Sequence, residues 1–94
     1  MLDHSSALSD VKILDFSHLL AGPFATQILG DYGAEVYKIE RIHAGDDFRR
    51  WNFFNKKVGG YSSASYMAWN RNKRSLALDI RKPEAKKIIY KMAE

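Results

Sequence analysis

The chain has 94 residues with a hydrophobic fraction of 46%, which is enough for one small domain with a core. It has no cysteine, which excludes disulfides, thiol nucleophiles and thiolate metal sites. Its formal charge of +4 is uneven: residues 71–94 hold 8 Lys/Arg and 3 Asp/Glu, a net of +5, whereas residues 1–70 hold 7 and 8, a net of −1.

Two further absences bear on location. No apolar run approaches the ~18 residues needed to cross a bilayer. The first ten residues also lack the pattern of a signal or transit peptide. We therefore expect a cytoplasmic protein with no membrane partner, whose basic last quarter suits a phosphate-bearing ligand.

The first half of the chain predicts a strand, a helix and a second strand. Residues 1–10 are polar and predict a flexible lead-in, and residues 11–16 (VKILDF) predict a buried strand. Pro23 fits the first position of a helix and Gly33 its left-handed end. The helical spacing predicts an inner face made of Phe24, Ala25, Ile28, Leu29 and Tyr32.

Residues 34–40 (AEVYKIE) alternate and predict the second strand, with Val36 and Ile39 in the core and Lys38 and Glu40 pointing elsewhere. Connections this short favour a βαβ unit with parallel strands. Residues 42–60 predict an ordered excursion, because the aromatic side chains at positions 51, 53 and 54 need burial.

The second half continues the same pattern. Residues 62–70 predict a helix, residues 75–80 (SLALDI) a third strand, and residues 82–94 an amphipathic helix with Ile88, Ile89 and Met92 on its inner face. Parallel sheets are normally covered on both faces, so these elements form an incomplete layer. We predict an α/β fold with a Rossmann-like parallel sheet, in which residues 11–94 are the N-terminal portion of a larger domain.

The loop after the first strand is a candidate anion site. Helix N-termini attract anions, and Gly22 either admits a ligand close to the backbone or only allows a tight turn; the two interpretations are even. The dinucleotide fingerprint is absent, and although Glu40 could stand for its ribose-binding acid, the adjacent Arg41 suits a phosphate better. NAD binding and a P-loop are therefore set aside.

Other polar clusters have ordinary explanations. The basic run at residues 70–75 (NRNKRS), beside Tyr66 and Trp69, could stack RNA, but without an RNA-binding sheet motif it supports RNA only weakly, and the alternative is a solvated helix end. The acids at positions 46 and 47 precede two arginines at 49 and 50, which favours a local ion-pair cluster over a metal site. No histidine has metal-ligand spacing, with His18 nearest the candidate loop, and no serine has a visible base.

Four segments together resemble one known family. They are ILDFSHLLAGPFATQILGDYGAEVYKIER, GDDFRRW, NRNKRSLALDI and KPEAKK, in this order. They resemble the N-terminal region of the class III CoA-transferases, the CaiB/BaiF family, over residues 11–94. The resemblance implies transfer of coenzyme A from an acyl-CoA to a carboxylic acid, with CoA as a substrate and no prosthetic group.

The resemblance also implies where coenzyme A would lie, across the carboxyl ends of the first strands. Arg41 would face the nucleotide phosphates, and Arg81 would be the charged contact near the adenine and the 3′-phosphate. The residues expected to bind CoA are Leu20, Ala21, Arg41, Leu78, Asp79, Ile80 and Arg81. A leucine at position 20, where some transferases of the family have a polar residue, leaves the acyl preference open.

The family's catalytic aspartate, which attacks the thioester, is implied to lie beyond residue 94. No aspartate here matches it, so we assign no catalytic residue and expect the 94-residue chain to be inactive alone, as a fragment or a short product. Whole family members are interlocked homodimers. A piece that lacks the covers of its apolar faces is expected to be marginally stable.

Two other functions stay open. The family includes α-methylacyl-CoA racemase, an isomerase whose acid–base residues also lie downstream. A non-catalytic nucleotide- or RNA-binding module would instead depend on Lys73 and Arg74 and be insensitive to Arg41.

Overall fold

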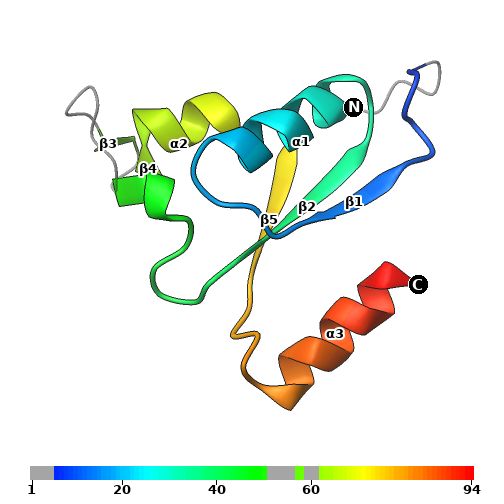
Figure 1. The fold of residues 1–94 in the computed structure, drawn as a ribbon, viewed down its shortest axis with the longest axis vertical. Coiled ribbons are helices and arrows are strands. Elements are labelled where there is room, and N and C mark those ends of the chain that lie inside the picture. The colour runs from blue at the N-terminus through cyan, green and yellow to red at the C-terminus, as the bar shows by residue number, and fades with distance from the viewer. Residues whose placement is uncertain (1–5, 51–56, 59–61) are drawn as a thin grey trace.

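The computed structural model describes residues 6–50, 57–58 and 62–94 (Figure 1). In chain order its elements are β1 (Lys12–Asp15), α1 (Ala21–Asp31), β2 (Glu35–Glu40), the 3-10 helix η1 (Asp47–Arg50), β3 (Lys57–Val58), β4 (Ser62–Ser63), α2 (Ala64–Trp69), β5 (Lys73–Ala77) and α3 (Pro83–Ala93). The strands and helices expected from the sequence are all present, but Ser62 and Ser63, expected at the start of a helix, form β4 of a short antiparallel pair with β3.

The main sheet has three parallel strands in the order β1–β2–β5, which makes β2 the central strand. The third strand begins two residues earlier and ends three residues earlier than its apolar alternation predicts. Pairing with β2 decides these bounds, since the last pair joins Glu40 to Ala77. The N–H of Leu78 still donates to the Glu40 carbonyl at 2.9 Å. The predicted α/β class with a parallel sheet is confirmed.

Helices α1 and α2 lie on one side of the strands in Figure 1, and α3 lies on the other. Gly33 follows the end of α1 with φ of 108°, which confirms the predicted helix end. Pro23 is the third residue of α1, which begins at Ala21, so the helix starts two residues before the predicted first position. No helix within the described ranges is both long and apolar enough to cross a bilayer.

The predicted inner face of α1 is wrong. Phe24, Ile28, Leu29 and Tyr32 are 38–60% exposed, whereas Pro23 and Gln27 are buried. The helix approaches the sheet along its Gly30 side, where a Cβ would lie 3.5 Å from Val36 Cγ2. The Gln27 amide oxygen also accepts the N–H of Arg71 at 3.0 Å. A small residue and a hydrogen-bonding residue therefore face the sheet, and the apolar stripe faces outward.

The predicted placement of the charged residues of β2 is also wrong. Lys38 is fully buried and Glu40 is 2% exposed, on the same face of the strand as Val36. A central parallel strand is covered on both faces of the sheet. Alternating residues along it therefore point to two buried faces, and neither set points to solvent. The core of this fold is consequently rich in ion pairs.

Helix α3 forms over the expected residues, but its predicted inner face is only partly covered. Ile88 is 45% exposed, and Ala85 is the one buried residue of the helix. The expected burial of the aromatic residues at positions 51, 53 and 54 lies outside the described residues. At the other end, the Leu8 N–H donates to the Tyr32 carbonyl at 3.0 Å.

Candidate functional site

A hollow of about 390 Å³ opens where β2 and β5 end. The carboxyl ends of parallel strands meet at one edge of a sheet, and in open α/β sheets ligands bind outside that edge. Its lining residues come from the segments that follow these two strands: Arg41, Ile42, Ala44, Leu78, Asp79, Ile80 and Arg81. The fold thus brings together five of the seven residues expected to bind coenzyme A.

Arg41 supplies one cation of this hollow, and its side chain is 52% exposed. Its Nη2 donates to the Gly45 carbonyl at 3.1 Å and also to the carboxylate of Asp47. The hydrogen bond from Arg41 outweighs burial and holds the pKa of Asp47 below its ordinary value. The guanidinium is therefore fixed in direction by the loop after β2 while one side stays open to solvent.

Arg81 supplies a second cation and is 85% exposed. Its Nε donates to Asp79 at 2.9 Å, and its backbone N–H donates to the same carboxylate at 3.1 Å. The hydrogen bond from Arg81 holds the pKa of Asp79 below its ordinary value. Asp79 thus positions the arginine and stays ionised, so its role here is to orient the cation.

Leu20 and Ala21 do not line this hollow. They lie at the start of α1, and Leu20 is 48% exposed. A Cβ at Gly22 would lie 2.3 Å from Ser17 Cβ, so the missing side chain makes room for Ser17. This close approach favours the tight-turn interpretation of Gly22 over direct admission of a ligand.

The expected ion-pair cluster at residues 46–50 is confirmed only for Asp47, which accepts from Arg50 and Arg41. Asp46 instead pairs with Lys38 at 2.6 Å, and both side chains are fully buried. The sequence interpretation missed this pair. A lysine between apolar residues of a central parallel strand was the available signal, because a buried lysine needs an acid.

Glu40 is unavailable to a ribose hydroxyl, because its carboxylate already accepts five hydrogen bonds from four residues. The donors are the Arg49 side chain at 2.8 Å, Ser75 Oγ at 2.6 Å, Tyr66 Oη at 3.0 Å and the Asp46 N–H at 2.8 Å. Burial alone would raise the pKa of Glu40, but these hydrogen bonds, led by that of Arg49, lower it to about 2. Its role is to hold the loop after β2 against the sheet.

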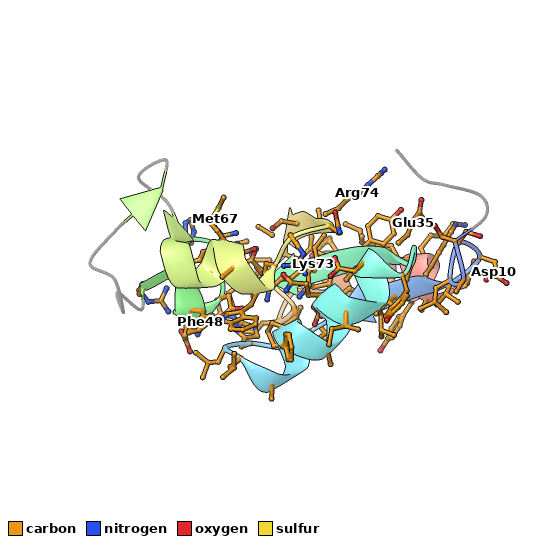
Figure 2. All side chains as sticks on the ribbon, turned by 90° about the horizontal axis from the view of Figure 1, so that it is seen from above. Asp10, Glu35, Phe48, Met67, Lys73 and Arg74 are labelled. Atoms are coloured by element: carbon orange, nitrogen blue, oxygen red, sulfur yellow. The ribbon has the colours of Figure 1, made fainter. Side chains whose placement is uncertain are left out.

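Two cations of the basic run at residues 70–75 are paired with acids of the described chain. Lys73 Nζ is 3.0 Å from Asp15 Oδ2, with both side chains at most 2% exposed, and Arg71 pairs with Asp31 at 2.6 Å. Figure 2 shows Lys73 directed into the molecule and Arg74 projecting away from it. Lys73 is therefore not exposed for contact with a nucleic acid.

Among the described residues, Ser17 and the acids around it show no catalytic arrangement. The Ser17 hydroxyl donates to Asp15, which is itself engaged by Thr26 and Lys73. In the part of the chain that the structure describes, no group of three His, Cys, Asp or Glu side chains could hold a metal ion. His18 lies with its Nδ1 3.9 Å from Asp46.

Comparison with known proteins decides the family. The model of CoA-transferase family III matches residues 8–94. This chain belongs to CoA-transferase family III. A human succinyl-CoA:glutarate CoA-transferase is 48% identical over 92 residues, covering 98% of this chain and 20% of the human protein. A formyl-CoA:oxalate CoA-transferase of Bradyrhizobium diazoefficiens is 36% identical over 88 residues, covering 94% of this chain and 20% of that protein.

A solved structure agrees with the sequence relatives. The crystal structure of a CaiB/BaiF family protein from Brucella suis superposes with a TM-score of 0.80 at 38% identity, covering 89% of this chain and 22% of that one. The resemblance drawn from the sequence motifs is confirmed. The chain spans about one fifth of the length of the family III relatives it matches.

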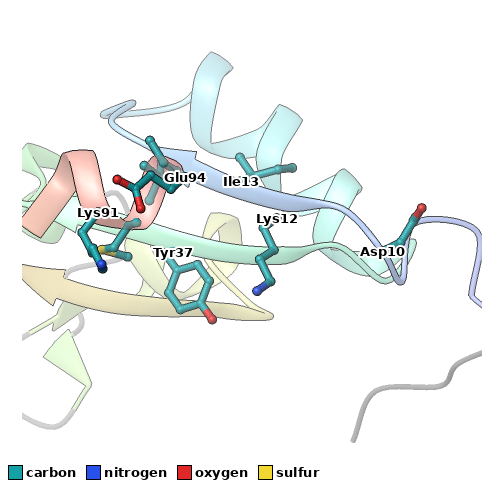
Figure 3. A pocket seen from close by; sticks show the side chains of 9 residues that line it. Asp10, Lys12, Ile13, Tyr37, Lys91 and Glu94 are labelled. Atoms are coloured by element: carbon teal, nitrogen blue, oxygen red, sulfur yellow. The ribbon is translucent and has the colours of Figure 1, made fainter.

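A second and larger hollow of about 840 Å³ lies away from the carboxyl edge (Figure 3). It is lined by residues of β1 and β2, including Lys12 and Tyr37, and by the last residues of α3. None of the seven residues expected to bind coenzyme A lines it. Size alone therefore does not identify the site in this family III chain.

Proposed function

We propose that this chain supplies the CoA-binding N-terminal part of a CoA-transferase that moves coenzyme A from an acyl-CoA to a carboxylic acid. The observation that carries the proposal is the hollow at the carboxyl edge, in which Arg41 and Arg81 flank an apolar wall that contains Leu78 and Ile80. Membership of CoA-transferase family III gives the reaction class.

The chemistry of the hollow suits the nucleotide end of coenzyme A. A volume of about 390 Å³ falls in the range of small-molecule sites, which are mostly apolar with a few placed polar groups. Coenzyme A carries a diphosphate and a 3′-phosphate, and guanidinium groups bind phosphate through paired hydrogen bonds. We assign Arg41 to the nucleotide phosphates and Arg81 to the neighbourhood of the 3′-phosphate. Leu20 and Ala21, outside the hollow, would line the remainder of the ligand.

We further propose that the reacting carboxylate comes from outside residues 1–94. Asp15 and Asp46 are buried in pairs with lysines, while Asp47 and Asp79 hold the arginines of the hollow. None of these four is free to attack a thioester. Binding is thus the role of this segment, and an interlocked homodimer of the family type would supply the rest.

The names of the relatives guide the choice of substrates. They pair succinyl-CoA with glutarate and formyl-CoA with oxalate, so a dicarboxylic acid is the class of acceptor to assay first. These names also favour a transferase over a racemase. Formation of the acceptor's CoA thioester, without epimerisation of a 2-methylacyl-CoA, is the expected outcome for the full-length gene product.

The experiment that tests CoA binding uses the full-length gene product and isothermal titration with coenzyme A. We expect Arg41→Gln to weaken binding by about tenfold, the size of losing a charge-assisted contact. Arg50→Gln is the matched control, because Arg50 also pairs with Asp47 but does not line the hollow. Equal effects of the two substitutions would overturn the assignment.

Arg81→Gln tests the other end of the ligand. The wild-type protein should prefer coenzyme A to 3′-dephospho-CoA, and the substitution should reduce that preference by about tenfold. Because Arg81 is 85% exposed, the fold should be unaffected, which thermal unfolding can verify. An unchanged preference would contradict the placement of the 3′-phosphate near Arg81.

A further inference from the structure

One buried carboxylate joins the two loops of the proposed site. Asp46 Oδ1 accepts the N–H of Leu19 at 3.0 Å and the N–H of Phe48 at 2.9 Å. Leu19 belongs to the loop after β1, directly before Leu20 and Ala21. Asp46 itself belongs to the loop after β2, which carries Arg41 and Ala44 of the hollow. The two loops are 27 residues apart along the chain and meet at this side chain.

The second oxygen of Asp46 is held by a lysine of the central strand β2. Asp46 Oδ2 accepts from Lys38 Nζ at 2.6 Å, and both side chains are fully buried. Lys38 also donates to Asn70 Oδ1 at 2.9 Å, which extends the contact to the segment before β5. A charge buried this fully must keep its partners, so the carboxylate is fixed in position by the sheet.

The backbone at Leu19 depends on this anchor. Its φ of 69° lies in the left-handed region, which is unfavourable for leucine and persists only where the surroundings impose it. The structure shows the Leu19 N–H donating to Asp46 in this conformation. Without an acceptor at this point, we expect the loop to relax and to carry Leu20 and Ala21 away from the edge of the sheet.

We propose that Asp46 is a positioning residue that holds the loop of Leu20 and Ala21 at a fixed position relative to the hollow that Arg41 lines. The proposal rests on the function proposed above. The acceptor atom of Asp46 performs this role, and the charge of Asp46 serves only to balance Lys38. Coenzyme A should need both loops, whereas its nucleotide fragment, adenosine 3′,5′-bisphosphate, should need the hollow alone.

Two double substitutions separate the acceptor from the charge. Both Lys38→Met with Asp46→Asn and Lys38→Met with Asp46→Leu remove the buried ion pair, and asparagine and leucine are similar in size. Only asparagine keeps an oxygen for the Leu19 and Phe48 N–H groups. The measurement is the ratio of the dissociation constants of adenosine 3′,5′-bisphosphate and coenzyme A, taken on the full-length gene product.

We expect the asparagine variant to keep this ratio within about twofold of wild type. The leucine variant should lower it by about tenfold, as for the loss of one or two net hydrogen bonds. A general loss of structure would weaken both ligands equally and leave the ratio unchanged, and that result would overturn the positioning role. Equal ratios for the two double variants would overturn it as well.

Amide hydrogen exchange tests the same contact without a substitution, should the leucine variant not fold. In the complex with coenzyme A, the Leu19 N–H should exchange as slowly as the Phe48 N–H, because they share one acceptor. Exchange of Leu19 at the rate of an open loop would contradict the proposal. If the wild-type protein binds neither ligand, it is the proposed function that fails.

Discussion

The carboxyl edge of the sheet and the outer surface of α1 are opposite in character. At the edge, buried charges such as Lys38, Asp46 and Glu40 are each matched by partners from within the chain. On α1, Phe24, Ile28 and Tyr32 are 38–60% exposed. The contrast teaches that the buried charges at the carboxyl edge have their partners among the described residues. The apolar side, by contrast, has the character of a surface built to be covered.

The largest loss of stability at the carboxyl edge is expected when one of its buried charges is left unpaired. Lys38→Ala would leave Asp46 buried without its cation, and we expect the free energy of unfolding to fall by about 3–5 kcal/mol. Lys82→Ala, on an exposed lysine beside α3, is the control and should change it by less than about 0.5 kcal/mol. Urea unfolding of the full-length gene product measures both. Similar losses of unfolding free energy for the two variants would contradict a special role of the buried charge pair.

Acid should weaken the same edge through Glu40. Its pKa is lowered from 4.5 to about 2 in the folded protein, so its stabilising contribution is complete above pH 4.5. That contribution is lost as the pH falls from about 4.5 towards 2, and the pKa difference corresponds to about 3 kcal/mol. Glu40→Gln should flatten this part of the pH–stability profile in urea unfolding. A variant that keeps the full wild-type slope would contradict the network around Glu40.

A smaller effect should distinguish the exposed charges at the edge from the buried ones. Asp47 competes with a phosphate for Arg41, so Asp47→Asn should strengthen coenzyme A binding by about threefold, as expected for an exposed pair. Raising the salt concentration should shrink the gain. In an Arg41→Gln background the same substitution should have no effect, and a persisting gain there would show that Asp47 acts elsewhere.

The smallest effect is expected on the outer surface of α1, the region that the carboxyl edge is compared with. Ile28→Gln, at 38% exposure, should change the stability of residues 1–94 in isolation by less than about 0.5 kcal/mol. In the full-length gene product the loss should be larger, because further chain would cover the helix. Equal effects in the two contexts, measured by urea unfolding, would mean that the face stays open.

The sequence predicted the helices and the strands, because caps and alternation are local features. Of the seven residues that line the hollow, the family resemblance named five, and Ile42 and Ala44 were not among them. Lys38 and Glu40 were misplaced, since alternation cannot tell a half-buried strand from a central one with two covered faces. The contact of Asp46 with Leu19 joins residues 27 apart in sequence, and only the pairing of β1 with β2 brings them together. Local spacing instead assigned Asp46 to the nearby arginines.

The close approach of α1 to the loop before it has a consequence for how this family can vary. A Cβ at Gly22 and the side chain of Ser17 compete for the same space, with only 2.3 Å between the two Cβ positions. The two positions therefore cannot both carry a Cβ, and we expect a relative with a side chain at one position to have glycine at the other. Gly22→Ala should accordingly be rescued by Ser17→Gly, and aligned relatives should show the two positions co-varying in volume.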